Sequence, residues 1–208
     1  MPKLYYTATS CGAASFIIAH TAGIQLETEQ VDIRSHVTSS GADFYSINPK
    51  GNVPTLVLED GTVLNENLAV QLHIADLKPG SVAPAPGTPE RSVLVNALSY
   101  VATEIHPAVG SFFMPNPPAD VTAFFRNRVQ HKLRYLSDHF IGDRRFIVGD
   151  SFTVVDAYLY IVLSWAGYVG LDLSEFPKVQ AYFEGIRDLE NVKAAHARIA
   201  ENPATTLQ

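Results

Sequence analysis

The first 78 residues contain two patterns of apolar and polar positions, one typical of strands and one typical of helices. Short β-prone runs at 4–6, 29–33, 53–58 and 62–64 predict four strands, and the Asp-Gly pair at 60–61 predicts a tight hairpin between the last two. Residues 12–22 (GAASFIIAHTA) and 66–78 instead carry apolar side chains at helical spacing. The order β-α-β followed by β-β-α predicts a compact α/β unit with a mixed four-stranded sheet covered by helices.

The second half of the chain shows only helical periodicity. Residues 78–89 (KPGSVAPAPGTP) contain four prolines and two glycines and can continue neither a helix nor a sheet. We therefore predict a first domain over 1–78, a linker over 79–89 and an all-helical domain over 90–208. Within that domain we expect a helix that starts after Thr88 and runs to about 113, and further helices at about 121–140, 154–169, 177–189 and 192–199.

Composition narrows the possible partners. The 208 residues carry 21 acidic and 15 basic side chains, a net charge of -6, and no basic patch, so neither nucleic acid nor a membrane is expected as a partner. The most apolar stretch, 157–171, is interrupted and too short to span a bilayer, and predicts a buried core helix. One cysteine permits no internal disulfide and the first residues lack a secretory h-region, which together predict a cytoplasmic protein.

Cys11 falls at the turn between the first strand and the first helix. Free backbone amides and the helix dipole at that end stabilise negative charge, so they would lower the pKa of the cysteine or hold the thiolate of a bound thiol ligand. A small buried hydrophobic role is equally compatible with the position. Ala14, three residues later, excludes a Cys-x-x-Cys dithiol, so any redox role is monothiol.

Val53-Pro54 opens a strand, where a proline cannot donate to the ladder. A cis bond would leave the Val53 backbone able to pair with a peptide ligand, whereas an edge strand with a trans proline is favoured by the residues alone. Glu66-Asn67 begins the next helix, where free amides can receive a carboxylate. The simpler alternative, favoured by these residues alone, is a helix capped by Asn65 with Glu66 in its first turn.

His106 stands next to Pro107 inside a long helix. A proline at that position removes one backbone hydrogen bond and kinks the helix, which can open a cleft, although a structural histidine is commoner than a functional one. The remaining histidines form no metal-ligand spacing, so no metal site is expected. No nucleophile elbow, Walker loop or dinucleotide fingerprint appears in the sequence.

Several of these segments together resemble the glutathione transferase family over essentially the whole chain. Residues 48–54 (NPKGNVP) are similar to the segment before the family's cis-proline, 64–70 (LNENLAV) to its glutamate-serine helix start, and 152–157 (FTVVDA) to its helix-capping motif. Cys11 and the segment 102–106 (ATEIH) make the chain most similar to the beta class of cytosolic transferases. The resemblance implies a thioredoxin-like N-terminal domain followed by a helical-bundle domain.

The resemblance also implies a set of site residues. Glutathione would be held by Asn52, Val53, Glu66, Asn67 and His106, with Pro54 as the cis-proline and with Cys11 and His106 as catalytic residues near the sulfur. Three positions depart from the family's pattern. Asn67 replaces a serine. Pro107 stands where bacterial members often carry a lysine, and His36 falls near another basic position. The last two departures weaken the expected charge pairing with the glycyl carboxylate of glutathione.

Three functions remain open from the sequence. The first is a detoxifying conjugation, in which glutathione as co-substrate attacks a small hydrophobic electrophile without a tightly bound cofactor. The second is glutathione-dependent thiol transfer through Cys11. The third is a non-catalytic protein that binds glutathione or a hydrophobic ligand with the same fold. The resemblance implies a homodimer, for which the turn at 60–61 and the helix after Glu66 are places to look. Candidate walls of the electrophile cleft are Tyr100, Phe112, Phe113, Met114 and Trp165.

Overall fold

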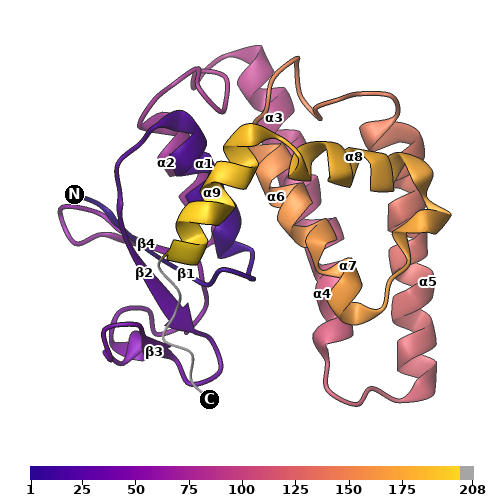
Figure 1. The fold of residues 1–208 in the computed structure, drawn as a ribbon, viewed down its shortest axis with the longest axis horizontal. Coiled ribbons are helices and arrows are strands. Elements are labelled where there is room, and N and C mark those ends of the chain that lie inside the picture. Colours follow the sequence, from indigo (N-terminus) through magenta and orange to yellow (C-terminus); the bar gives the residue numbers. More distant parts are fainter. Residues whose placement is uncertain (202–208) are drawn as a thin grey trace.

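The computed structural model describes residues 1–201, in which a sheet flanked by helices lies beside a group of helices (Figure 1). Residues 202–208, the end of the predicted helical domain, lie outside the described residues. The strand order of the sheet is β3-β2-β1-β4-β5. The strands are β1 (Lys3–Tyr6), β2 (Glu27–Asp32), β3 (Val37–Thr38), β4 (Thr55–Val57) and β5 (Val63–Leu64).

The sheet is mixed, as predicted, but it has five strands instead of four. Strand β1 pairs in parallel with β2, with Leu4 opposite Thr28, and antiparallel with β4, with Leu4 opposite Leu56. The additional strand β3 has two residues and pairs antiparallel with the end of β2. Strand β3 was not predicted, because so short a strand, inside a polar segment, shows no alternation of its own.

Two helices join the sheet to the rest of the molecule. Helix α1 (Gly12–Ala22) packs on β1 and helix α2 (Asn67–Asp76) on β4, and the two helices contact each other. Helix α1 ends at Gly23, whose φ of 66° is left-handed and whose N–H bonds back to the last turn, as its sequence position indicated. Helix α1 also contacts α6 (Val154–Ser164) and α9 (Glu190–Glu201), so it lies between the sheet and the helices of the second half.

The first long helix of the second half contains a widened turn. Helix α3 (Pro89–Tyr100) continues through a π-helical turn (Val101–Ile105) into α4 (His106–Gly110) and a 3-10 turn that ends at Phe113. Pro107 has no N–H to donate to the preceding turn, and the π-helical turn lies immediately before it. The predicted helix to about 113 is therefore confirmed, and the predicted kink near His106 is a π-helical turn.

The other helices follow the predicted pattern with shifted ends. They are α5 (Ala119–Tyr135), which continues as a π-helical stretch (Leu136–Ile141), then α6, α7 (Ala166–Val169), α8 (Pro177–Arg187) and α9. Every residue from 154 to 163 is buried, so α6 is the central helix of this half. Among the described residues, no helix combines the length and the apolar character that crossing a membrane requires.

The predicted capping box opens helix α6. Asp156, which is fully buried, accepts hydrogen bonds from the backbone N–H and the hydroxyl of Thr153, both at 2.8 Å. Its other oxygen accepts from the N–H of Ile147 at 2.9 Å and from the hydroxyl of Tyr182 at 2.7 Å. One carboxylate thus ties the start of α6 to the preceding loop and to α8.

One continuous apolar cluster connects the two halves. It includes Leu4 of the sheet, Ile17 of α1, Leu159 of α6 and Val192 of α9. The indole N–H of Trp165 also donates to the carbonyl of Thr9, at 2.9 Å, across the same boundary. Because both halves share this core, side chains that come from either half hold fixed positions in any site between them.

Candidate functional site

A pocket of about 590 Å³ lies where the starts of α1 and α2 face the helix that carries His106. Its lining comes from both halves of the molecule. The residues are Cys11, Asn52, Val53, Glu66, Asn67, Leu68, Ala102, His106, Pro107, Gly110 and Tyr158. The pocket therefore contains all six side chains that the sequence analysis predicted to bind a ligand or to catalyse.

Cys11 is the N-cap residue of α1 and is partly buried. Its thiol donates a hydrogen bond to the carbonyl oxygen of Val53 at 3.4 Å. Burial raises the pKa of the thiol to about 12, and the backbone amides of Cys11 and Gly12 offset only part of that effect. The prediction that the helix N-terminus lowers this pKa is wrong for the free protein, because desolvation of the sulfur outweighs the nearby amides.

The Val53–Pro54 peptide bond is cis. The resemblance implied this geometry, whereas the residues alone favoured a trans proline. In the part of the chain that the structure describes, the Val53 N–H has no hydrogen-bond acceptor, and its carbonyl accepts only from Cys11. A short segment of backbone on the pocket wall is therefore available to a ligand.

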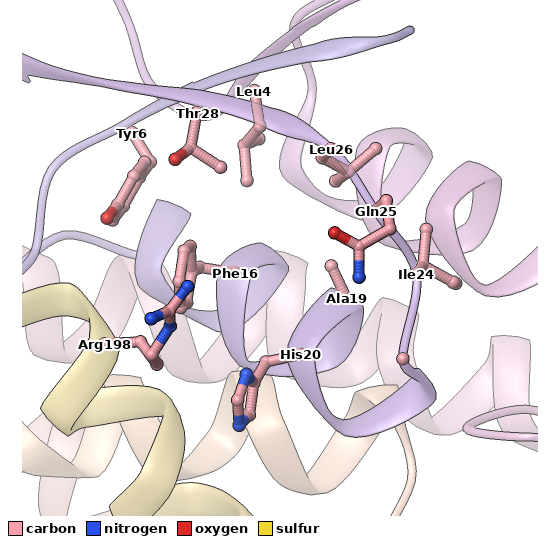
Figure 2. A pocket seen from close by; sticks show the side chains of 11 residues that line it. Leu4, Tyr6, Phe16, Ala19, His20, Ile24, Gln25, Leu26, Thr28 and Arg198 are labelled. Carbon is pink, nitrogen blue, oxygen red and sulfur yellow. The ribbon is translucent and has the colours of Figure 1, made fainter.

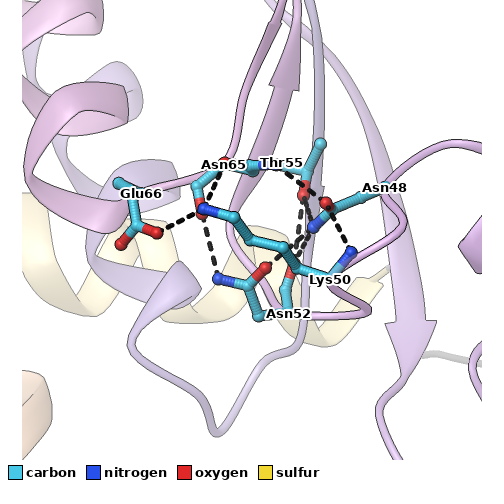
Figure 3. A network of polar contacts seen from close by, with 6 residues as sticks. All are labelled: Asn48, Lys50, Asn52, Thr55, Asn65 and Glu66. Carbon is cyan, nitrogen blue, oxygen red and sulfur yellow. Dashed lines mark hydrogen bonds and ion pairs between the residues drawn. The ribbon is translucent and has the colours of Figure 1, made fainter.

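A polar network holds the loop before β4 against the start of α2 (Figure 3). The buried Asn48 accepts from the side-chain amide of Asn65 at 2.9 Å, and Asn52 donates to the Asn65 carbonyl at 2.9 Å. The Lys50 ammonium contacts Oε1 of Glu66 at 2.6 Å and Oδ1 of Asn65 at 3.0 Å. The sequence analysis missed these roles of Asn48, Lys50 and Asn65, although their amide and ammonium groups flank the predicted site.

The first turn of α2 has open backbone donors. Glu66 is the N-cap residue and its side chain makes no capping bond, so the alternative in which Asn65 caps the helix is wrong by one position. The amide nitrogen of the Asn67 side chain is buried without a partner in the described chain, while its Oδ1 accepts from Gln71 at 3.0 Å. Because these N–H donors are available, the N-terminus of α2 can bind an anionic group.

His106 reaches the pocket from the start of α4. Its Nδ1 lies 2.5 Å from the hydroxyl oxygen of Tyr158, and its ring meets the indole of Trp165 edge to face at 4.9 Å. Burial lowers the pKa of the imidazole, so the ring is neutral at pH 7. Tyr158 was not predicted as a site residue, because it occurs in the apolar run of α6, where an aromatic side chain indicates core packing.

The other residues singled out from the sequence are placed differently. Pro107 lines the pocket, whereas His36 is not among its lining residues and lies against Tyr45, with the two rings tilted and their centroids 4.3 Å apart. Phe113 is half exposed and lies edge to face with Trp165 at 5.7 Å. These positions leave one aromatic wall, at Phe113 and Trp165, close to His106.

Two of the five candidate cleft walls pack elsewhere. Tyr100 contacts Tyr135 and Phe140 at 5.3 and 5.1 Å, inside the helical half. Phe112 contacts Phe125 at 6.1 Å. Aromatic residues at helical spacing pack against other side chains more often than they line a ligand site, and these two do so here.

A smaller cavity of about 190 Å³ lies between the sheet and the second half of α1 (Figure 2). It is lined by side chains such as Tyr6, Phe16, His20, Thr28 and Arg198, and by none of the predicted site residues. Among the residues that the structure describes, no group of three or more His, Cys, Asp or Glu side chains could hold a metal ion.

Comparison with known families matches both halves of the chain. The family model for the N-terminal domain of glutathione S-transferases matches residues 11–77, and the model for the C-terminal domain matches residues 119–185. The chain is 33% identical to glutathione S-transferase GstA of Escherichia coli O157:H7, an alignment that covers 93% of this chain and 96% of that protein.

Solved structures give the same result. A glutathione transferase from Methylococcus capsulatus superposes with a TM-score of 0.90 at 38% identity and covers 97% of this chain and 100% of its own. A sphingomonad glutathione S-transferase complexed with glutathione gives 0.88 at 35%, with 95% and 98% covered. A bacterial beta class transferase from Sphingomonas chungbukensis gives 0.87 at 34%, with 94% and 98% covered. On this similarity across both domains, the chain belongs to the glutathione S-transferase family.

Proposed function

We propose that this transferase binds reduced glutathione in the pocket between its two halves and joins the glutathione sulfur to a small hydrophobic electrophile. The observation that carries the proposal is that Cys11, Asn52, Val53, Glu66, Asn67 and His106, chosen from the sequence, line one pocket. The sphingomonad relative described as complexed with glutathione supports the choice of ligand.

The γ-glutamyl end of glutathione fits the start of α2. Its α-carboxylate would accept hydrogen bonds from the open amides of the first turn and from the Asn67 side-chain nitrogen, which has no hydrogen-bond partner within residues 1–201. Its α-ammonium would pair with Glu66, whose Oε2 makes no bond in the described chain while Lys50 occupies Oε1. The backbone of the cysteinyl residue would pair with the free N–H and the carbonyl of Val53.

This placement brings the ligand sulfur close to Cys11. Because burial keeps the Cys11 thiol protonated, its S–H can turn from the Val53 carbonyl to the ligand and donate to the glutathione thiolate. The thiolate then attacks the electrophilic carbon, forms the carbon–sulfur bond and expels the leaving group as an anion, while the thiol proton passes to solvent. Cys11 therefore acts as a donor and forms no covalent intermediate in this reaction.

The electrophile would bind against the aromatic wall beside the pocket. Phe113 and Met114 are both about half exposed, at 54% and 49%, and Phe113 contacts Trp165. Exposed apolar side chains next to a polar pocket offer a surface for a small hydrophobic substrate. This arrangement supports a cleft built from Phe113, Met114 and Trp165, without the other two aromatic residues that the sequence suggested.

Thiol transfer is the second candidate, and the position of Cys11 in the pocket favours it. A glutathionyl disulfide GS–SR would react with Cys11 to give Cys11–S–SG and RSH, and a second glutathione would release oxidised glutathione and restore the thiol. The attacking species is the thiolate, and a pKa of about 12 leaves little of it at neutral pH. Conjugation, which needs no Cys11 thiolate, is therefore the better supported reaction.

Calorimetry with reduced glutathione, on wild type and Cys11→Ala side by side, tests the proposal, followed by turnover of an aryl halide on the same samples. Binding by both proteins, with conjugation that is slower in Cys11→Ala but still present, would support a transferase in which Cys11 is an auxiliary donor. Thiol transfer that disappears in Cys11→Ala, without conjugation in either protein, would favour the second candidate. Absence of glutathione binding by the wild type would refute both.

A homodimer in the cytoplasm, acting in detoxification, completes the proposal. Three exposed apolar side chains, Val63, Leu77 and Val93, support a partner surface around the turn at 60–61 and the end of α2. Light scattering on the eluting protein should give twice the chain mass of 22.7 kDa. A monomer at micromolar concentration would refute the dimer.

A further inference from the structure

The inference concerns Tyr158 and rests on the proposed function. We propose that Tyr158 is a positioning residue that fixes His106 in the tautomer with its proton on Nε2, so that the imidazole acts toward glutathione only as a hydrogen-bond donor. Nothing in the family match assigns a role to this tyrosine.

Tyr158 is a buried polar group in an apolar helix. Its side chain is 2% exposed, it belongs to the fully buried run of α6, and it lines the pocket beside Cys11 and His106. Its ring stands perpendicular to the imidazole of His106, with centroids 5.7 Å apart and an interplanar angle of 90°. A phenol buried in this way needs a hydrogen-bond partner, because a hydroxyl that is removed from water and left without one destabilises the folded state.

His106 is the acceptor that the structure provides. The Tyr158 hydroxyl oxygen lies 2.5 Å from Nδ1, and within residues 1–201 the hydroxyl has no second acceptor at hydrogen-bond distance. Burial raises the pKa of the phenol well above its usual range, an effect that the Asn67 side chain only partly offsets, so the hydroxyl keeps its proton. The O–H therefore donates to Nδ1, because the opposite arrangement would leave a buried phenol proton unbound.

The tautomer of His106 follows from this bond. A neutral imidazole has one N–H, and an Nδ1 that accepts from Tyr158 places that proton on Nε2. Burial lowers the pKa of His106, so the neutral ring is the form present at pH 7. Trp165 packs against the ring edge at 4.9 Å, which restricts its rotation.

A donor at this position suits an anionic ligand. Glutathione presents carboxylate, carbonyl and thiolate acceptors, and Nε2 has no hydrogen-bond partner in the described protein. The other tautomer would present an unprotonated Nε2, which would repel those acceptors. The bond from Tyr158 to Nδ1 thus makes Nε2 of His106 a fixed hydrogen-bond donor. In metal sites, a hydrogen bond to the second ring nitrogen orients a ligating histidine in the same way.

The same helix provides a matched control. Tyr160 lies two residues further along α6, and its hydroxyl oxygen is 3.0 Å from Nε2 of His196 on α9. The Tyr160 side chain is 5% exposed and is not among the residues that line the glutathione pocket. Tyr158→Phe and Tyr160→Phe therefore each remove one tyrosine–histidine bond from one buried helix, but only the first touches the pocket.

Nitrogen-15 NMR of the imidazoles in the ligand-free protein, assigned with a His106→Gln sample, tests the tautomer directly. At a pH where His106 is neutral, wild type and Tyr160→Phe should show the Nε2–H form of His106, and Tyr158→Phe should show a mixture. Calorimetry should then give a Kd for glutathione raised about fivefold in Tyr158→Phe and unchanged in Tyr160→Phe, the size expected for one hydrogen bond.

The results separate this inference from the proposed function. An Nδ1–H signal for His106 in the wild type would overturn the inference, even if Tyr158→Phe failed to fold. An unchanged tautomer or an unchanged Kd in a folded Tyr158→Phe protein would also overturn it. A wild type that shows the Nε2–H form but does not bind glutathione would refute the proposed function and, with it, the role of the donor, while leaving the tautomer assignment in place.

Discussion

The carboxylate of Asp156 offers the sharpest test of how the helical half is held together. Asp156→Asn keeps the shape of the side chain but replaces one carboxylate oxygen with an NH₂ group. In the native protein each oxygen accepts two hydrogen bonds, from Ile147 and Tyr182 on one side and twice from Thr153 on the other. Whichever oxygen is replaced, one buried backbone N–H, from Ile147 or from Thr153, then faces the new NH₂ group, and the hydroxyl beside it must turn from donating to accepting.

The magnitude follows from these contacts. A hydrogen bond to a charged group contributes about 1.5–3 kcal/mol, and Asp156 is fully buried, so water cannot replace the bond from the backbone N–H that is lost. The bonds that remain weaken, because the asparagine is neutral. Removing the charge also recovers part of the lost free energy of unfolding, because burial of the carboxylate is unfavourable and raises the pKa of Asp156. We expect the free energy of unfolding to fall by about 2–3 kcal/mol, from the loss of one such bond and the weakening of the others.

Urea unfolding followed by circular dichroism measures this change. Asp172→Asn is the control, because Asp172 is exposed and caps a 3-10 turn, where it accepts from the N–H of Ser174 at 2.8 Å. The midpoint should shift much more for Asp156→Asn than for the control, with a similar slope in both. A loss below about 1 kcal/mol for Asp156→Asn would refute the assignment of four buried bonds to this carboxylate.

Three further outcomes are expected. At about pH 7.5, iodoacetamide should alkylate Cys11 at least about a hundredfold more slowly than a free cysteine, because burial raises its pKa to about 12, and a rate equal to that of the free amino acid would contradict this. Glu66→Gln should raise the KM for glutathione about tenfold and leave the unfolding midpoint unchanged, since the side chain is exposed, whereas an unchanged KM would exclude Glu66 as the ammonium partner. Burial alone would raise the pKa of Glu29, but hydrogen bonds from Lys3 and Ser40 lower it from 4.5 to about 2. The ionised Glu29 therefore stabilises the folded protein above pH 4.5, and this contribution is lost as the pH falls from 4.5 to 2. Acid unfolding of Glu29→Gln should lack this loss, and an identical acid profile in both proteins would contradict the lowered pKa.

Local sequence signals predicted most of the fold. Helix α1 with its left-handed Gly23, the capping box at Asp156 and the absence of strands between residues 89 and 201 were all confirmed, because each depends on contacts within a few residues. The third strand was missed because two residues carry no period. The domain limits at 78 and 90 stay a prediction.

The electrostatics of the site could not be predicted in the same way. The position of Cys11 at a helix N-terminus indicated a lowered pKa, and the structure gives a raised one. Nearby amides can be inferred from the chain order, but desolvation depends on how closely distant segments pack around the sulfur. The Val53 carbonyl that the thiol contacts is 42 positions away along the chain.

The sequence by itself determined most of the order of the elements, the caps at Gly23 and Thr153, and the family whose motifs the chain carries, since these depend on residue types at fixed spacings. Only the tertiary structure decided which groups share the pocket. Tyr158 is separated by 52 positions from His106, so no local pattern could pair them, and the same helix directs Tyr160 to His196 outside the pocket. Whether a buried tyrosine serves the core or the site depends on the direction of one side chain, which packing between the two halves fixes.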